Sequence, residues 1–190
     1  MEWLIISIIF FVLILFSILI QKSSYDKEVP GKTVWLLWLQ GWDKAPWLQQ
    51  RVRDSWIKHN PEWNVELVDS KNLRNYVDVP YINKIQASAA KSDVIRLSLL
   101  AKHGGVWADS TMLCMAPLDE WIYDALDPVG IWMYHGGADG QGPASWFIVS
   151  AKQSYIMKKW KNACDEYWSS RAKEDEYFWM DGLFNKLLKT

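Results

Sequence analysis

Three charged residues in the middle of the chain have types and spacings that could support chemistry. Asp93 and Arg96 lie three positions apart, so on a helix both would project from one face. Asp109 follows residues 106–108, an apolar run typical of a short buried strand. A carboxylate just past the carboxyl end of a strand lies where open α/β sheets bind ligands. Taken alone, these residues also fit ordinary roles, namely a turn at Asp109 and an ion pair between Asp93 and Arg96.

The elements that must position these residues can be predicted from the pattern around them. Apolar residues recur at helical spacing and predict an amphipathic helix over residues 89–103: Ala90, Val94, Leu97 and Ala101. Gly104 stands where a helix ends in the left-handed conformation that glycine adopts most easily. A helix, a glycine turn and a strand are therefore expected to deliver Asp109 to a crevice.

These blocks resemble a known family. Ser92-Asp93-x-x-Arg96, followed by Gly104-Gly105-Val106-Trp107-x-Asp109, is similar to the core of the capsular polysaccharide synthesis glycosyltransferases. They are relatives of the α-mannosyltransferases that carry an Asp-x-Asp sugar-nucleotide motif. Further similar blocks occur in the family's order between residues 32 and 184: residues 38–43, Ser55-Trp56 with Asn60-Pro61, residues 145–148 and residues 177–179.

The resemblance implies a fold and an activity. The fold would be α/β, a GT-A-like (Rossmann-like) and mostly parallel sheet flanked by helices, with residues 33–190 as the catalytic domain. The activity would be transfer of a sugar from a UDP- or GDP-sugar to a glycan or polysaccharide acceptor, assisted by Mn²⁺ or Mg²⁺. Both ions prefer oxygen ligands and can stabilise the negative charge of a departing diphosphate.

The resemblance also implies roles for individual residues. The catalytic residues would be Asp109, Asp181 and Arg96, and the metal ligands Asp109, Thr111 and Asp181. The residues expected to bind the nucleotide sugar are Trp38, Gln40, Trp42, Asp93, Arg96, Ser110 and Trp146. Thr111 stands where the second acid of the motif is expected. That departure leaves a non-catalytic sugar-nucleotide or glycan-binding module as the alternative, and a membrane-anchored scaffold with purely structural tryptophans as a third.

Several roles stay open on the sequence. Arg96 could contact the donor or support Asp109. A catalytic base, which an inverting transfer needs and a retaining one does not, could be Asp139, Glu176 or Asp181. Trp42 is expected to be partly exposed beside the nucleotide base. The Asp109→Asn variant is expected to keep or gain stability, because a carboxylate facing an empty metal site is unfavourable.

Periodicity predicts the remaining elements. Asp69 follows the second strand and could bind a ribose, although a turn is the commoner role. The predicted strands are residues 33–39, 65–68, 112–116, 131–134 and 146–150. The predicted helices are a segment that has Pro46 in its first turn and ends at Asn60-Pro61, and residues 121–126, 156–168 and 177–188. The Gly-rich stretch at residues 135–143 lacks phosphate-loop spacing and is expected to be either a mobile loop over the acceptor site or a plain surface loop.

Composition narrows the possible partners. The 190 residues carry a net charge of −1, which argues against nucleic acid as a partner. The two cysteines, Cys114 and Cys164, have no spacing that suggests a disulfide or a metal site, so a reducing compartment is expected. The fourteen tryptophans could serve either the core or a sugar-binding cleft.

The amino-terminal segment is expected to cross a membrane. Residues 3–20 are apolar except for two serines, which is long enough to span a bilayer. We therefore expect a transmembrane anchor at residues 1–22 and a linker at residues 23–32, with a cleaved signal peptide as the alternative. Lys22, Lys27 and Lys32 all follow the span, so the positive-inside rule predicts a single-pass protein with a cytoplasmic catalytic domain.

Overall fold

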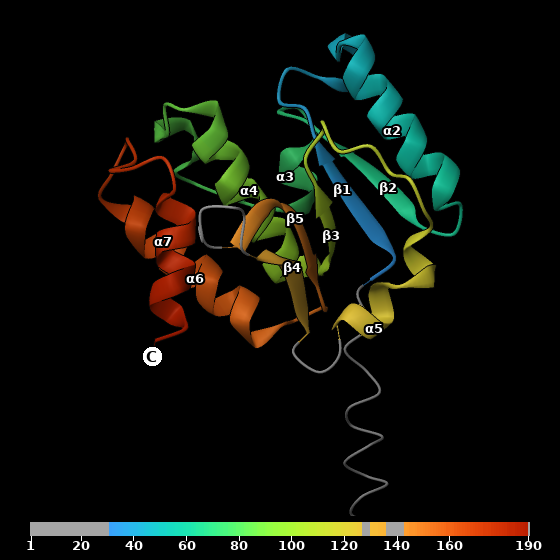
Figure 1. The fold of residues 1–190 in the computed structure, drawn as a ribbon. Coiled ribbons are helices and arrows are strands. Elements are labelled where there is room, and N and C mark those ends of the chain that lie inside the picture. The colour runs from blue at the N-terminus through green and yellow to red at the C-terminus, as the bar shows by residue number, and fades with distance from the viewer. Residues whose placement is uncertain (1–30, 127–129, 136–142, 190) are drawn as a thin grey trace, which may run out of the picture.

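The computed structural model describes residues 31–126, 130–135 and 143–189, which form one sheet with helices on both faces (Figure 1). The five strands lie in the order β2-β1-β3-β5-β4. Strand β1 (Thr33–Leu37) pairs in parallel with β2 (Asn64–Val68) and with β3 (Gly105–Ala108). Strand β5 (Pro143–Ser150) pairs antiparallel with both β3 and β4 (Ile131–His135).

The prediction of a mostly parallel sheet is wrong for half of it. The pairings β2-β1-β3 are parallel, whereas both pairings of β5 are antiparallel, so the sheet is mixed. The sequence of a strand that is buried on both faces is a run of apolar residues, whether its neighbours are parallel or antiparallel to it. The pattern that located β4 and β5 therefore could not reveal that β5 runs against its neighbours.

The predicted strand at residues 112–116 is also wrong, because this segment forms no strand. It runs instead along α2 (Trp47–His59). The indole of Trp56 donates a hydrogen bond to the carbonyl of Met112 at 2.8 Å, and the amide of Cys114 donates to the hydroxyl of Ser55 at 3.0 Å. These bonds to α2 take the place of a strand ladder.

The two faces of the sheet carry separate cores. On one face, Trp35 and Leu37 pack beneath α4 (Ser88–His103), α6 (Tyr155–Ser169) and α7 (Trp179–Leu187), with the short α3 (Leu73–Tyr76) at the edge. On the other face, Val34 and Leu36 pack beneath α2 and α5 (Ile122–Leu126). Alternate residues of β1 thus face opposite cores, as the period of a strand requires. The predicted helices are confirmed within a few residues of their expected ends.

Most of the described tryptophans are buried in these two cores, and only Trp47 and Trp146 are among the exposed large apolar residues. Cys114 and Cys164 are buried free thiols, in keeping with the expected lack of a disulfide. In the part of the chain that the structure describes, no helix is both long and apolar enough to cross a membrane. The anchor predicted at residues 1–22 lies outside the described residues.

Candidate active site

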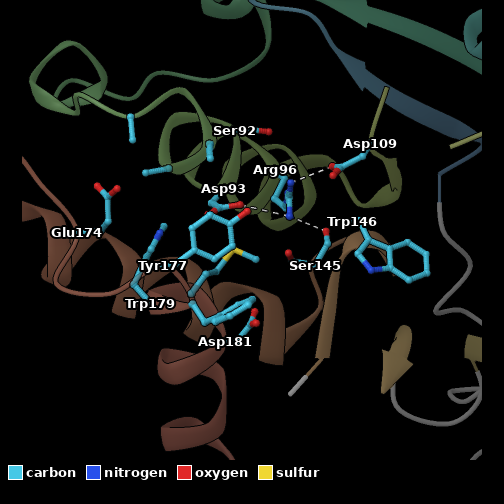
Figure 2. Close-up of a pocket in the computed structure, with 15 residues that line it drawn as sticks. Ser92, Asp93, Arg96, Asp109, Ser145, Trp146, Glu174, Tyr177, Trp179 and Asp181 are labelled. Carbon is cyan, nitrogen blue, oxygen red and sulfur yellow. Dashed lines mark hydrogen bonds and ion pairs between the residues drawn. The ribbon is translucent and has the colours of Figure 1, made fainter. Parts of the chain in front are cut away.

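The pocket that contains the sequence-predicted charges lies between three segments of the chain (Figure 2). The amino-terminal half of α4 forms one side, the start of β5 forms a second, and residues 174–181 leading into α7 form a third. The pocket encloses about 380 Å³. The charged side chains in its described lining are four acids and one arginine: Asp93, Asp109, Glu174, Asp181 and Arg96.

Two glycines bring Asp109 to this pocket. Gly104 ends α4 with φ 67°, and Gly105 begins β3 with φ 94°, both in the region that favours glycine. A Cβ on Gly105 would lie 2.5 Å from the carbonyl oxygen of Thr33, so β3 can approach β1 only without a side chain there. The amide of Asp109 then donates to the carbonyl of Trp146 at 2.9 Å, which fixes the residue at the end of β3.

Arg96 is the centre of the site, and it is only 4% exposed. Its guanidinium donates to one carboxylate oxygen of Asp109 at 2.9 Å and to the carbonyl of Ser145 at 2.7 Å. It also lies 3.3 Å from a carboxylate oxygen of Asp93 and 5.0 Å over the ring of Trp107. Arg96 therefore holds two acids and the start of β5 in one arrangement.

The two oxygens of the Asp109 carboxylate differ in their contacts with the described residues. Its Oδ1 accepts from Arg96 and, at 2.8 Å, from the indole of Trp107. No hydrogen bond to its Oδ2 is formed by the described residues, and a third of the side chain is exposed. A carboxylate held by one oxygen and open at the other can serve as a ligand for a cation.

Two of the acids have raised pKa values, which favour their neutral forms. Burial raises the pKa of Asp93 to about 6; the charge of Arg96 opposes this rise, and those of Asp109 and Asp181 add to it. Burial likewise raises the pKa of Asp181 to about 6, again opposed by Arg96. Carboxyl groups with such values exchange protons near neutral pH and are candidates for acid–base work.

The structure brings together five of the predicted site residues in the pocket lining, namely Asp93, Arg96, Asp109, Trp146 and Asp181. It leaves five others outside that lining: Trp38, Gln40, Trp42, Ser110 and Thr111. Gln40 and Thr111 are exposed and Trp38 is half-buried, beyond the ends of β1 and β3. Ser110 is buried, and its hydroxyl donates to the carbonyl of Leu37 at 2.6 Å, which ties those two strand ends together.

The expectation that Trp42 is partly exposed is wrong. Its ring is 8% exposed, within the core beneath α2, and its indole donates to the carbonyl of Val68 at 3.0 Å. Asp69 forms a turn, because its carboxylate accepts from the amides of Lys71 and Asn72. Among the candidate bases, Glu176 is exposed and outside the pocket lining, and Asp139 lies outside the described residues.

Sequence reasoning missed two contributors to the site. Glu174 lines the pocket, and its Oε2 is buried without a hydrogen-bond partner in the described structure. Ser145 supplies the backbone carbonyl that Arg96 holds. A backbone carbonyl carries no signal of its own in the sequence, and Glu174 lies in an acidic run that is typical of a solvated surface.

The fit of a divalent cation can be tested on these residues. No group of three or more His, Cys, Asp or Glu side chains that could hold a metal ion occurs in the described residues. Asp181 lies across the pocket from Asp109, on the far side of Arg96 (Figure 2). Mg²⁺ is often held by one or two carboxylates together with substrate phosphates and water, so the open oxygen of Asp109 fits such an ion.

Similar sequences occur among known proteins. Residues 9–190 match the profile of a family described as capsular polysaccharide synthesis protein. The chain is 26% identical over 171 residues to the glycosyltransferase afumC of Aspergillus fumigatus, covering 82% of this chain and 42% of that protein. It is 28% identical over 113 residues to the initiation-specific alpha-1,6-mannosyltransferase of Candida albicans, covering 53% of this chain and 29% of that protein. The chain thus spans less than half the length of these relatives.

A similar fold occurs in a solved structure. The PaToxG glycosyltransferase superposes with a TM-score of 0.57 over 84% of this chain and 68% of that one, at 15% sequence identity. A likeness at this identity concerns the fold. It supports a mixed sheet flanked by helices as the framework of the pocket.

Proposed function

This chain belongs to the capsular polysaccharide synthesis protein family, and from that premise we propose that it is a glycosyltransferase that uses a nucleotide-diphospho-sugar. The observation that carries the proposal is the carboxylate of Asp109, fixed by Arg96 and Trp107 and open at its second oxygen. The glycosyltransferases among its relatives support the same reaction class. Membrane attachment through residues 1–22 is a further proposal, which rests on the sequence alone.

Divalent-metal assistance follows from the charges of the pocket. Four acids line it against one arginine, and that arginine already contacts two of them. A nucleotide diphosphate is strongly anionic and would be repelled from such a site. A bound Mn²⁺ or Mg²⁺ would neutralise the phosphates and stabilise the charge of the departing diphosphate. Asp109 would hold it, with the exposed hydroxyl of Thr111 as a second candidate ligand.

The other residues then have separate tasks. Arg96 orients Asp109 by one nitrogen and the start of β5 by another, so it is a positioning residue. Asp181 faces the pocket with a pKa of about 6, and we assign to it the proton of the acceptor hydroxyl if the transfer needs a base. Trp146 exposes its ring beside Asp109 and offers a surface on which a sugar or a base can stack.

The test is a panel of UDP- and GDP-sugars, scored by nucleotide release with and without Mn²⁺, on wild type and Asp109→Asn. We expect metal-dependent release by wild type and a fall of about 10²-fold or more in the variant, the scale of losing one preorganised electrostatic contact. Asp54→Asn, an exposed change on α2, is the matched control and should behave as wild type. Wild-type binding of the donor without release would favour the non-catalytic alternative. Equal, metal-independent release by both proteins would remove Asp109 from the site.

The contacts of Asp109 favour a loss of stability in this variant, in contrast to the expectation from the sequence. Asp109 is a partner of the buried Arg96, so Asp109→Asn leaves that cation with Asp93 as its remaining carboxylate. The variant should lose about 1–2 kcal/mol of unfolding free energy, the cost of weakening a hydrogen bond to a buried charge. Chemical unfolding therefore has to accompany the activity assay, so that the folded fraction of each protein is known.

A further inference from the structure

Two neighbouring aromatic rings on the α7 side of the pocket face solvent. Tyr177 is 77% exposed and Phe178 is 50% exposed, although both line the pocket and the next residue, Trp179, is buried. Their rings meet edge to face, with centroids 4.9 Å apart. Adjacent exposed rings at the mouth of a polar pocket are a common feature of ligand-binding surfaces.

The backbone beneath these rings is held on both sides. The amide of Asp175 donates to the hydroxyl of Tyr167 at 2.8 Å, and the Asp175 carboxylate pairs with Arg171 at 3.2 Å. After the rings, the carbonyl of Phe178 accepts from the amide of Gly182 in the first turn of α7 at 3.0 Å. The rings are therefore presented by a fixed segment.

The pocket lining beside the rings is rich in hydrogen-bond acceptors. Glu174 and Asp181 line the same pocket, and the buried Oε2 of Glu174 has no hydrogen-bond partner among the described residues. Arg96 is the one cationic side chain in the described lining, and its charge is matched by Asp93 and Asp109. The α7 side of the pocket is thus both aromatic and acidic.

This combination suits one class of compound. A pyranose ring has a face of C–H groups that packs on an aromatic ring, and a rim of hydroxyl groups that donate to carboxylates. A uronate or a phosphorylated sugar would instead meet like charges in a partly buried site. We propose that Tyr177, Phe178, Glu174 and Asp181 form the acceptor subsite, and that this subsite selects an uncharged saccharide. The inference rests on the proposed function.

A second aromatic pair marks the opposite side of the site. Tyr134 and Trp146 stack with centroids 4.9 Å apart, and both are exposed. Figure 2 shows Trp146 and Tyr177 on either side of Arg96. Because Trp146 and its neighbour Tyr134 adjoin Asp109, we assign binding of the donor to this pair of rings. Tyr177 and Phe178 are then left to bind the acceptor.

The experiment measures binding directly, by ligand-observed NMR with methyl glycosides of glucose, galactose and mannose and with the corresponding uronates. Wild type should bind at least one neutral glycoside and bind its uronate at least about tenfold more weakly. Tyr177→Ala should weaken binding of the neutral glycoside about tenfold, the scale of one aromatic contact, and Tyr177→Phe should retain it. Glu174→Gln should reduce the difference in affinity between the neutral glycoside and its uronate, because it removes one of the negative charges of the pocket.

The control is Tyr155→Ala on α6, because Tyr155 is 72% exposed and lies outside the pocket lining. It should bind the glycosides as wild type does. No binding of any neutral glycoside by wild type, equal binding of the uronates, or an unchanged Tyr177→Ala variant would each overturn the proposal. Donor hydrolysis by wild type is measured in parallel. Hydrolysis without saccharide binding would sink this inference alone, whereas saccharide binding without hydrolysis would sink the proposed function.

Discussion

At the scale of single residues, the site depends on a buried cation. Arg96 is almost fully enclosed, yet it contacts two carboxylates and a backbone carbonyl. Burying a guanidinium costs free energy unless its N–H groups find hydrogen-bond or ion-pair partners, and these three partners satisfy most of them. Its Nε is buried without a partner in the described structure, so the match is incomplete. The arrangement stabilises Arg96 and at the same time orients Asp109.

The first prediction at this scale concerns the catalytic base. Asp93 and Asp181 both have a pKa of about 6, but Asp93 is paired with Arg96. If Asp181 accepts the acceptor's proton, kcat/KM should rise between pH 5 and pH 7 with an apparent pKa near 6. Asp181→Asn should lose this rise and lower kcat by about 10²–10⁴-fold, the usual contribution of general base catalysis.

The matched control is Glu176→Gln, because Glu176 is exposed and lies outside the pocket lining. Its pH–rate profile should overlay that of wild type. An Asp181→Asn variant that keeps both the rate and the rise near pH 6 would show that Asp181 is not the base.

The residues most accessible to sequence reasoning were those with a fixed local geometry. Asp93 and Arg96 share a helix face, and Asp109 follows a strand, so their meeting in one pocket could be predicted. Trp42 could not be placed in the same way. Its burial depends on a hydrogen bond to Val68 and on packing beneath α2, and neither contact leaves a pattern in the sequence around it.

At the scale of elements, the junction between α4 and β3 decides where Asp109 lies. The helix, the glycine turn and the strand were all predicted, because helical spacing and a left-handed glycine are local signals. The direction of β5 was not predicted, because it depends on which strands become its neighbours. Residues 112–116 were assigned wrongly for the same reason, since their hydrogen bonds go to α2.

The second prediction concerns this junction. Gly105→Ala should destabilise the protein by about 2–4 kcal/mol, because the new Cβ combines a positive φ with a clash against the backbone of β1. Any movement of β3 that relieves the clash would displace Asp109 as well. Urea unfolding gives the free energy, and nucleotide release by the folded fraction gives the effect on Asp109.

Gly182→Ala is the control for a glycine without such a constraint. Gly182 lies inside α7, and a Cβ there would approach the flexible end of Glu176 at 3.3 Å. The substitution should be neutral or stabilising by up to about 1 kcal/mol, since alanine favours a helix more than glycine does. Similar unfolding free energies for the two alanine variants would refute the role given to Gly105.

At the scale of the whole molecule, an almost neutral protein concentrates acids at one place. The chain has a net charge of −1, whereas four acids and one arginine line the pocket. Two of those acids, Asp93 and Asp181, are present at the expense of stability, because burial disfavours their ionised forms and raises the pKa of each to about 6. Stability should therefore depend on pH through the pocket, and this dependence can be isolated with one substitution.

The last prediction follows from the raised pKa of Asp93. The pKa of Asp93 is about 6 in the folded protein, whereas its ordinary value, which we take for the unfolded chain, is 3.8. Between these two pH values the folded state therefore binds more protons than the unfolded state. The contribution of Asp93 to the unfolding free energy should then be fully present below pH 4 and be lost as the pH rises through 6. Asp93→Asn cannot ionise, so its stability relative to wild type should increase by about 1–3 kcal/mol between pH 4 and pH 8.

Urea unfolding of both proteins at intervals of one pH unit measures this difference, provided that the slope with denaturant is unchanged. Asp54→Asn, which removes an acid that is 49% exposed and lies outside the pocket lining, is the matched control. Asp93 also faces Asp109 and Asp181 from other elements, so removing its charge relieves repulsion as well as burial. A difference that stays constant would mean that folding does not shift the pKa of Asp93, and a difference that shrinks as the pH rises would mean that its carboxylate is stabilised in the folded protein. In either case the acidic pocket would impose no cost on stability at this residue.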